Sequence, residues 1–187
     1  PLYGTRKEQN WAVRQSRRFH HAYRTCYPYF QKGKVVLDVG AYPGSFLKIL
    51  RLLWGSELSL IAAGMPVHSD FPSDVKDLGI DFIPCDLDDA VTTEYPTTLE
   101  LADNSVDVVV CTEVIEHLYS VRHLMIEMGR VLKPNGVAYV STNNVAYLPG
   151  LVRLICGETN LDVDLEQTSA LVDSEWRGHV RFFSLNQ

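Results

Sequence analysis

Residues 34–50 read KVVLDVGAYPGSFLKIL and contain the pattern that decides the fold. The apolar run 35–39 predicts a strand that is buried on both faces of a parallel sheet. Gly40, Pro43 and Gly44 then predict a tight turn, after which apolar residues recur at helical spacing. Glycine lets the backbone approach a ligand closely, and the N-terminus of a helix attracts an anionic group. We therefore predict a strand, a turn that binds a cofactor, and a helix.

The spacing of the glycines separates two kinds of cofactor turn. A dinucleotide-binding turn prefers Gly-x-Gly-x-x-Gly, whereas here an acid, Asp38, precedes two glycines and Tyr42 lies between them. The pattern Asp38-x-Gly40-x-x-x-Gly44 resembles motif I of the class I S-adenosylmethionine-dependent methyltransferases. The alternative is an ordinary strand-to-helix turn of an unrelated α/β domain.

Length and composition predict one soluble globular domain. The chain has 187 residues, of which 46% are hydrophobic and 21% charged, and its apolar runs are too short to span a membrane. The sequence shows no signal-peptide pattern, so we expect a cytoplasmic protein. The four cysteines are far apart and form no Cys-x-x-Cys pair, which argues against a zinc cluster and favours reduced thiols.

Positive charge is concentrated at the start of the chain. Residues 1–34 hold eight Lys or Arg and a single acid, although the whole chain has a net charge of −6. Residues 8–27 place aromatic side chains on one helical face and arginines on another, which predicts an amphipathic helix that ends before Pro28.

We assign this leading helix to residues 1–33 and the main α/β domain to residues 34–187. The helix is expected to pack its aromatic side on the domain and to cover the opening of the cofactor or substrate site. Arg17 or Arg18 would then meet a phosphate or carboxylate of the substrate. The alternative is a basic face that only contacts solvent.

Two further strands are expected at residues 58–63 and 80–87. In nucleotide-binding sheets an acid at the end of the second strand commonly accepts hydrogen bonds from ribose hydroxyls, but this chain has Ala63-Gly64-Met65 there. Pro84 predicts that the third strand lies at an edge of the sheet. Residues 88–105 lack periodicity and predict a long loop of the kind that tends to be functional or mobile.

Residues 106–144 form the second informative stretch. A strand at 106–112 leads into an ionisable segment, and a helix that ends at the turn 133–136 precedes a strand at 137–141. Open α/β sheets bind ligands at the carboxyl ends of their strands. We therefore expect the loop after Asp38 and the segment around Glu113 to converge on a hollow of adenosine size.

The same stretch is similar to the second half of class I methyltransferases of the small-molecule branch, through its Asp-Val-Val-Val strand, its Glu-x-x-Glu-His segment and its Arg-Val-Leu-Lys-Pro-Asn-Gly turn. The resemblance covers residues 34–144, and the tail 178–184 is similar to members found among sugar- and lipid-modifying enzymes. It implies a Rossmann-like, doubly wound α/β sheet of five parallel strands in the order 3-2-1-4-5. Family members continue with an antiparallel hairpin, so we interpret the chain ending at Gln187 as truncated.

The resemblance also implies S-adenosylmethionine as methyl donor, S-adenosylhomocysteine as product, and a set of contacts. Gly40, Ala41, Tyr42 and Gly44 would surround the methionine part of the cofactor, and Asp38 would support their turn or bind the amino group. Asp86 would bind the adenine amine with Leu87 beside the ring. Thr112 and Glu113 would form the near wall of the site. The full set is Asp38, Gly40, Ala41, Tyr42, Gly44, Asp86, Leu87, Thr112 and Glu113.

Methyl transfer from a sulfonium is an in-line displacement, so its rate depends on alignment and on deprotonation of a hydroxyl acceptor. Histidine titrates near neutral pH, and we therefore predict His117 as the general base, oriented or charged by Glu116 or Glu113. The alternative is that this segment supplies favourable charge at a helix start while His117 caps or packs. We expect no metal site, because one histidine and two glutamates are a thin ligand set. His179, close to Arg181, is a further site candidate.

Three functions remain open at this point. The first is methylation of an oxygen or nitrogen of a small-molecule acceptor such as a sugar, a lipid precursor or another metabolite. The second is a catalytically silent module that binds a partner protein, which Tyr42 and the missing second-strand acid favour. The third is RNA 2′-O methylation, because Asp-Val-Gly-Ala-Tyr-Pro-Gly is similar to the turn of that family. Glu113 in place of an aspartate, and a fifth strand without lysine, argue against RNA, as does the net negative charge.

Overall fold

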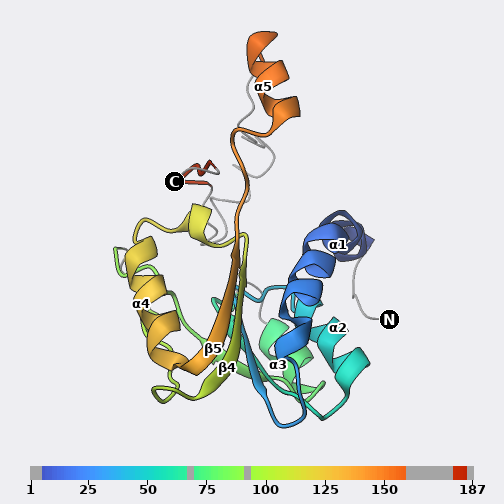
Figure 1. Cartoon of the computed structure of the whole chain (residues 1–187), viewed down its shortest axis with the longest axis vertical. Coiled ribbons are helices and arrows are strands. Elements are labelled where there is room, and N and C mark those ends of the chain that lie inside the picture. Colours follow the sequence, from blue (N-terminus) through green and yellow to red (C-terminus); the bar gives the residue numbers. More distant parts are fainter. Residues whose placement is uncertain (1–5, 67–69, 91–93, 159–178, 185–187) are drawn as a thin grey trace.

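The computed structural model describes residues 6–66, 70–90, 94–158 and 179–184, with side chains from Ser16 onward. Its centre is a sheet in which all neighbouring strands are parallel, in the order β3-β2-β1-β4-β5 (Figure 1). The strands are β1 Val35–Val39, β2 Ser59–Gly64, β3 Asp81–Pro84, β4 Val106–Thr112 and β5 Leu132–Ser141. This order confirms the expected fold, and β3 lies at the edge, as its proline predicts.

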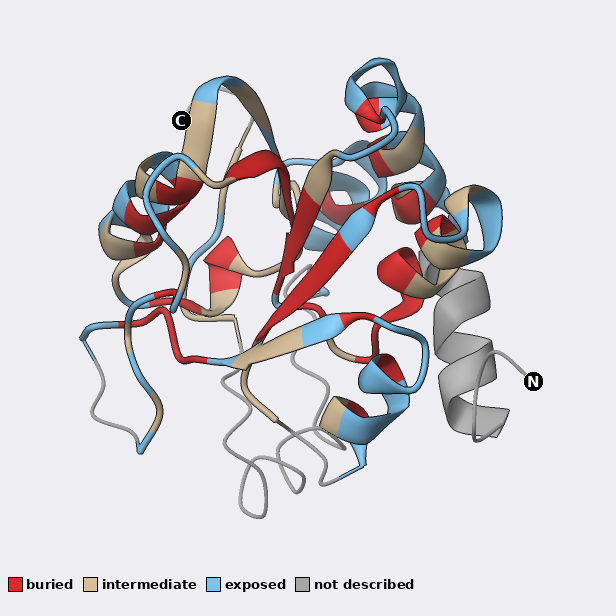
Figure 2. Cartoon of the chain, turned by 90° about the horizontal axis from the view of Figure 1, so that it is seen from below, coloured by how far each residue is buried: buried red, intermediate tan, exposed pale blue. Residues whose placement is uncertain are grey.

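Helices cover both faces of the sheet (Figure 1). Helices α1 (Arg6–Cys26), α2 (Ser45–Trp54) and α3 (Phe71–Lys76) lie on one face, and α4 (Val121–Val131) lies on the other. Successive side chains of a strand point to opposite faces, so Val36 joins the buried cluster of α2 while Leu37 joins that of α4. Strand β4 is buried along its whole length, and Figure 2 shows this burial at the centre of the sheet. Helix α5 (Leu148–Ile155) projects away from the carboxyl end of β5 (Figure 1).

Helix α1 ends where the proline signal predicts. It stops at Cys26, and Pro28 lies in the short 3₁₀ helix η1 (Tyr27–Tyr29) that follows. Phe19, Ala22 and Cys26 are buried in the cluster that also contains residues of α2, so this face of α1 packs on the domain. Residues 8–27 also include Trp11 on the predicted aromatic face and Arg14 on the predicted arginine face, whose side chains lie outside the described residues.

The start of β5 differs from the sequence prediction. The turn expected at residues 133–136 lies inside the strand, where Val106 pairs with Leu132 and Val108 already pairs with Val137. Asn135 has a φ of +69°, and a Cβ on Gly136 would lie 3.1 Å from the carbonyl oxygen of Asp107. The Pro-Asn-Gly signal therefore forms a bulge against β4 instead of a separate loop.

Side chains of α4 hold the loop segment 94–105, and Arg130 makes most of these contacts. The guanidinium of Arg130 donates to the carbonyl oxygens of Leu99 and Leu101 at 2.8 and 2.7 Å and to the Asp103 carboxylate at 2.8 Å. The Glu127 carboxylate accepts the backbone N–H of Leu99 at 2.9 Å. These contacts give this part of the loop a structural role.

Among the described helices, none is both long enough and apolar enough to cross a membrane.

Candidate active site

The turn between β1 and α2 has a backbone that requires glycine. Gly40 has a φ of +71°, and a Cβ built there would lie 2.4 Å from Cγ2 of Val114. Gly44 has a φ of +79° and precedes the first residue of α2. The N–H groups of Gly40 and Ala41 donate to the carbonyl oxygen of Ala63 at 2.8 and 3.2 Å, which fixes the turn to the end of β2. The predicted turn therefore forms, and only glycine fits at position 40.

The end of strand β2, where nucleotide-binding sheets commonly carry an acid, lies beside this turn. Strand β2 ends at Gly64, whose φ of +149° also favours glycine. A Cβ on Gly64 would lie 3.5 Å from Cα of Gly40. The ends of β1 and β2 are thus brought together by small residues, and the end of β2 offers no carboxylate for ribose hydroxyls.

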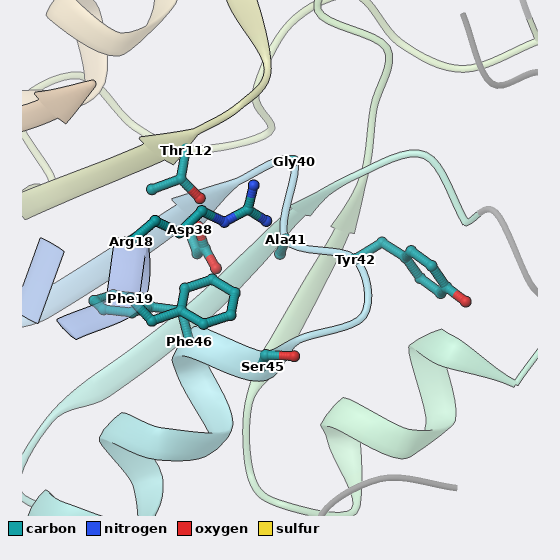
Figure 3. Close-up of a pocket in the computed structure, with 9 residues that line it drawn as sticks. All are labelled: Arg18, Phe19, Asp38, Gly40, Ala41, Tyr42, Ser45, Phe46 and Thr112. Atoms are coloured by element: carbon teal, nitrogen blue, oxygen red, sulfur yellow. The ribbon is translucent and has the colours of Figure 1, made fainter. Parts of the chain in front are cut away.

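A small cavity lies between this turn, the end of β4 and helix α1 (Figure 3). Its volume is about 10 Å³, which is the room of one water molecule. The loop after Asp38 and the end of β4 converge here, as predicted, but the hollow is far smaller than adenosine. The lining residues are Arg18, Phe19, Asp38, Gly40, Ala41, Tyr42, Ser45, Phe46 and Thr112.

Helix α1, and not Tyr42, closes this cavity. The ring of Tyr42 points away from the hollow (Figure 3) and packs edge-on against Phe71, with ring centroids 5.3 Å apart. Phe19 of α1 is buried beside Phe46 of α2, with centroids 6.3 Å apart. The expectation of an adenosine-sized hollow was therefore wrong for this state of the molecule, because side chains of the leading helix fill the space.

Arg18 faces the acidic groups of the site. Figure 3 shows its guanidinium between Gly40 and Thr112, close to Asp38. Burial lowers the pKa of Arg18, and the charges of Glu113, Asp38 and Glu116 oppose that shift. Burial raises the pKa of the Asp38 carboxyl to about 7, against the opposing charge of Arg18. The site thus combines one arginine with carboxyl groups that are hard to ionise.

Ser45 is a site residue that the sequence reasoning missed. It is the first residue of α2, lines the cavity and is buried, and its Oγ has no hydrogen-bond partner among the described residues. A buried hydroxyl without a partner is costly, so it is a natural contact for a ligand. The available signal was its position directly after Gly44, at a predicted helix N-terminus.

Glu113 and Glu116 lie on the short segment that follows β4. Glu113 has a φ of +57°, its N–H donates to the carbonyl oxygen of Ser141 at 2.9 Å, and its carboxylate accepts the Ser141 hydroxyl at 3.5 Å. Burial and the neighbouring Glu116 raise the pKa of Glu113. Glu116 is buried in the 3₁₀ helix η2 (Ile115–His117), where it accepts the Thr142 hydroxyl at 2.9 Å and the Asn143 amide at 3.4 Å.

The structure brings His117 together with a second histidine, a contact that the sequence did not predict. Its ring lies beside that of His179, with centroids 4.8 Å apart. The backbone N–H groups of Val180 and Arg181 both donate to the carbonyl oxygen of Glu116, at 2.8 and 3.1 Å. The side-chain ligand atoms of Glu116, His117 and His179 all lie within 4.8 Å of one another. The structure therefore supplies the second histidine whose absence was the reason to expect no metal site.

Asp86 and Leu87 are buried after β3 but do not line the cavity. The carboxylate of Asp86 accepts the N–H of Asp88 at 3.2 Å. Asp88, which the sequence reasoning left in the loop, is fully buried and accepts the N–H groups of Tyr119 and Ser120 at 2.7 and 3.0 Å. Asp88 thus connects the end of β3 to the start of α4, and the adenine contacts remain predictions.

Comparison with known proteins places this geometry in a family. A family model described as "Methyltransferase domain" matches residues 11–187. A ubiquinone biosynthesis O-methyltransferase of Rickettsia typhi is 43% identical over 61 residues, which are 30% of this chain and 25% of that protein. A probable S-adenosylmethionine-dependent methyltransferase of Mycolicibacterium smegmatis is 51% identical over 53 residues, or 28% of this chain and 21% of that one. The chain thus matches about a quarter of the length of these curated relatives.

A solved structure gives the same fold over a longer stretch. The structure of a SAM-dependent methyltransferase from Archaeoglobus fulgidus superposes with a TM-score of 0.54 and 19% identity, over 82% of this chain and 65% of that one. At this identity the likeness concerns the fold alone.

Proposed function

The chain belongs to the methyltransferase-domain family, and we propose that it transfers a methyl group from S-adenosylmethionine to an oxygen or nitrogen of a small molecule. The observation that carries this proposal is the turn after β1, where Gly40 and Gly44 both have a positive φ and the chain then enters the N-terminus of α2. A backbone of this kind can approach the methionine part of the cofactor closely.

The residues around the turn fit the polar end of such a cofactor. The Ser45 hydroxyl, which has no partner among the described residues, is available to its methionine group. Arg18 would pair with the carboxylate of the cofactor and Asp38 with its amino group. Asp86 and Leu87 would contact the adenine. When bound, the cofactor supplies an electrophilic methyl group on a sulfonium.

Binding requires that α1 moves. The cavity of about 10 Å³ cannot admit the cofactor while Arg18 and Phe19 fill the hollow. We therefore propose that α1 is a cover that withdraws for cofactor exchange and closes again over the bound cofactor. Closure would also exclude water from the transfer step.

His117 is the proposed general base for a hydroxyl acceptor. It lies on η2 at the carboxyl end of β4, next to Glu116. An oxygen acceptor is supported by the name of the Rickettsia relative, which is an O-methyltransferase. Glu116 would hold the segment in position through Thr142 and Asn143.

Calorimetry tests the cofactor part directly. We expect the full chain to bind S-adenosylhomocysteine, and Arg18→Ala to weaken that binding at least about tenfold because a charge-assisted contact is lost. Arg17→Ala is the matched control, since Arg17 is exposed on the same helix, and it should leave the affinity unchanged. A folded protein that binds neither S-adenosylmethionine nor S-adenosylhomocysteine at millimolar concentration would refute the proposal.

The second candidate is a catalytically silent module that binds a partner protein. Two observations favour it: the closed cavity and the missing carboxylate at the end of β2. The same calorimetry separates the two functions, because a silent module of this kind gives no cofactor heat in either the parent or the variants.

A further inference from the structure

We propose that Glu116, His117 and His179 form a binding site for one divalent first-row transition ion of the Zn²⁺ type. The three side chains offer two imidazole nitrogens and one carboxylate oxygen, all within 4.8 Å of one another. Imidazole and carboxylate together suit Zn²⁺ and its neighbours, whereas Mg²⁺ and Ca²⁺ prefer oxygen ligands alone.

The separation of the ligand atoms is close to what such an ion needs. Zn–N and Zn–O bonds of about 2.0–2.2 Å place ligands roughly 3.3 Å apart in a tetrahedron. The observed spread of up to 4.8 Å would close through small side-chain rotations of the two histidines. Both histidines are partly exposed, while Glu116 is buried.

The groups around the ligands hold them in place as metal sites require. Thr142 donates its hydroxyl to the Glu116 carboxylate at 2.9 Å, and Asn143 donates its amide at 3.4 Å. Such second contacts orient a ligating carboxylate. Glu113 lies beside Glu116, so a cation bound there would face a second carboxyl group.

The tail of the chain brings His179 to this site by several independent bonds. The N–H groups of Val180 and Arg181 donate to the carbonyl oxygen of Glu116, and Nε of Arg181 donates to that of Leu118 at 3.0 Å. The carbonyl oxygen of Phe183 accepts the N–H of Val145 at 2.9 Å. Because none of these bonds uses the His179 side chain, its imidazole is available as a ligand.

Three protein ligands leave coordination positions open, as in catalytic zinc sites. An oxygen of the methyl acceptor would take one of these positions, and this role rests on the proposed methyl transfer. With the ion bound, His117 is a ligand, and the ion replaces it as the group that activates the acceptor hydroxyl. The bound ion would lower the pKa of the acceptor hydroxyl, whose proton passes to water. The oxygen electron pair then forms the new bond to the methyl carbon, and the electrons of the broken carbon–sulfur bond remain on the sulfur of S-adenosylhomocysteine.

The test measures Zn²⁺ and Co²⁺ binding to the full chain after chelator treatment, by calorimetry and by the visible spectrum of bound Co²⁺. The parent and all variants carry Cys156→Ser, because an exposed thiol such as Cys156 can itself bind these ions. We expect one equivalent of Zn²⁺, weakened at least about 100-fold by His179→Ala or His117→Ala and about tenfold by Thr142→Val. His20→Ala, on the exposed side of α1, is the matched control and should bind as the parent does.

Three results would overturn the proposal: a parent that binds no Zn²⁺ at micromolar concentration, a His179→Ala variant that binds as tightly as the parent, or a preference for Mg²⁺. His179→Ala should fold, because the backbone bonds of the tail do not involve its ring. Titration of the same samples with S-adenosylhomocysteine separates the two proposals. Zn²⁺ binding without cofactor binding refutes only the function, and the reverse refutes only the metal site.

Discussion

The acidic side chains buried at the two ends of strand β4 differ in how many cationic partners they have. At the amino end, Asp107 lies between two lysines, with its carboxylate 2.8 Å from Nζ of Lys34 and 2.7 Å from Nζ of Lys133. It also accepts the N–H of Val35 at 3.0 Å, and these partners lower its pKa to about 2 in spite of burial. Every oxygen of this carboxylate has a cationic partner.

At the carboxyl end the balance is reversed. Asp38, Glu113 and Glu116 share the charge of Arg18, and the pKa values of Asp38 and Glu113 are raised by burial. An end with matched charges stabilises the fold, whereas an end with excess acid is less stable and is suited to bind a cation. The comparison separates the structural acids of this chain from those that we assign to function.

The largest expected effect comes from Gly40, in the turn at the carboxyl end of β1, where alanine adds a single methyl group. Gly40→Ala should lower the free energy of unfolding by at least about 3 kcal/mol, because its Cβ would meet Val114 and its φ is positive. Cofactor affinity should fall at least about 100-fold, as measured by calorimetry on folded protein.

Gly33→Ala is the control for that variant. Gly33 precedes β1, has a φ of +81°, and a Cβ there would meet nothing within 4 Å. It should cost only about 1 kcal/mol in urea unfolding and leave cofactor affinity unchanged. Equal losses in the two variants would mean that backbone strain alone, and not the close contact with Val114, explains the requirement for glycine at position 40.

The pH dependence of stability is the next largest effect. The folded pKa of Asp38, about 7, lies above its unfolded value of 3.8, so the native state binds more protons between these pH values and stability falls as pH rises. From pH 5 to 8 this group should remove about 2 to 3 kcal/mol of unfolding free energy. Urea unfolding of Asp38→Asn relative to the parent should reveal that difference, and parallel pH profiles would contradict it.

Asp107→Asn tests the matched end. The pKa of Asp107 is lowered from 3.8 to about 2, so its contribution is full above pH 4 and disappears as pH falls through 2. The variant should lose about 2 kcal/mol of unfolding free energy at pH 7, with unchanged cofactor affinity. Asp103→Asn, which removes an exposed acid that pairs with Arg130, is the control and should cost less than about 0.5 kcal/mol.

The smallest expected effect is a gain, and not a loss, in the free energy of unfolding. Glu113→Gln should stabilise the metal-free protein by up to about 1 kcal/mol at pH 7, because it removes repulsion from Glu116 while its side-chain oxygen still accepts the Ser141 hydroxyl. Glu127→Gln should instead destabilise, since the contacts with Arg130 lower the pKa of Glu127. Thermal unfolding measures both, and two changes of the same sign would contradict the comparison.

The sequence was sufficient where the decisive contacts are local. The strand, turn and helix from residue 35 to 54 form as predicted, because apolar period, glycine conformation and helix start all lie within one segment. The strand order followed from resemblance over residues 34–144, and it is confirmed. The bulge at Asn135 was missed, since it depends on how Gly136 packs against Asp107 of a neighbouring strand.

The parts of the site that the sequence could not predict all depend on distant pairs. Tyr42 turns away from the hollow because Phe71 offers it an edge-on partner. His117 meets His179 only because the tail bonds to the backbone of Glu116. Phe19 fills the cavity because α1 packs on α2, and spacing along the chain carries no signal for any of these contacts.

The packing of Phe19 and Ala22 has a consequence for measured cofactor affinity. If cofactor can enter only molecules in which α1 has withdrawn, the apparent dissociation constant equals the intrinsic one divided by the open fraction. Each 1.4 kcal/mol of interaction between α1 and the rest of the domain then weakens apparent affinity about tenfold. A substitution that loosens this helix would therefore tighten cofactor binding without touching the cofactor.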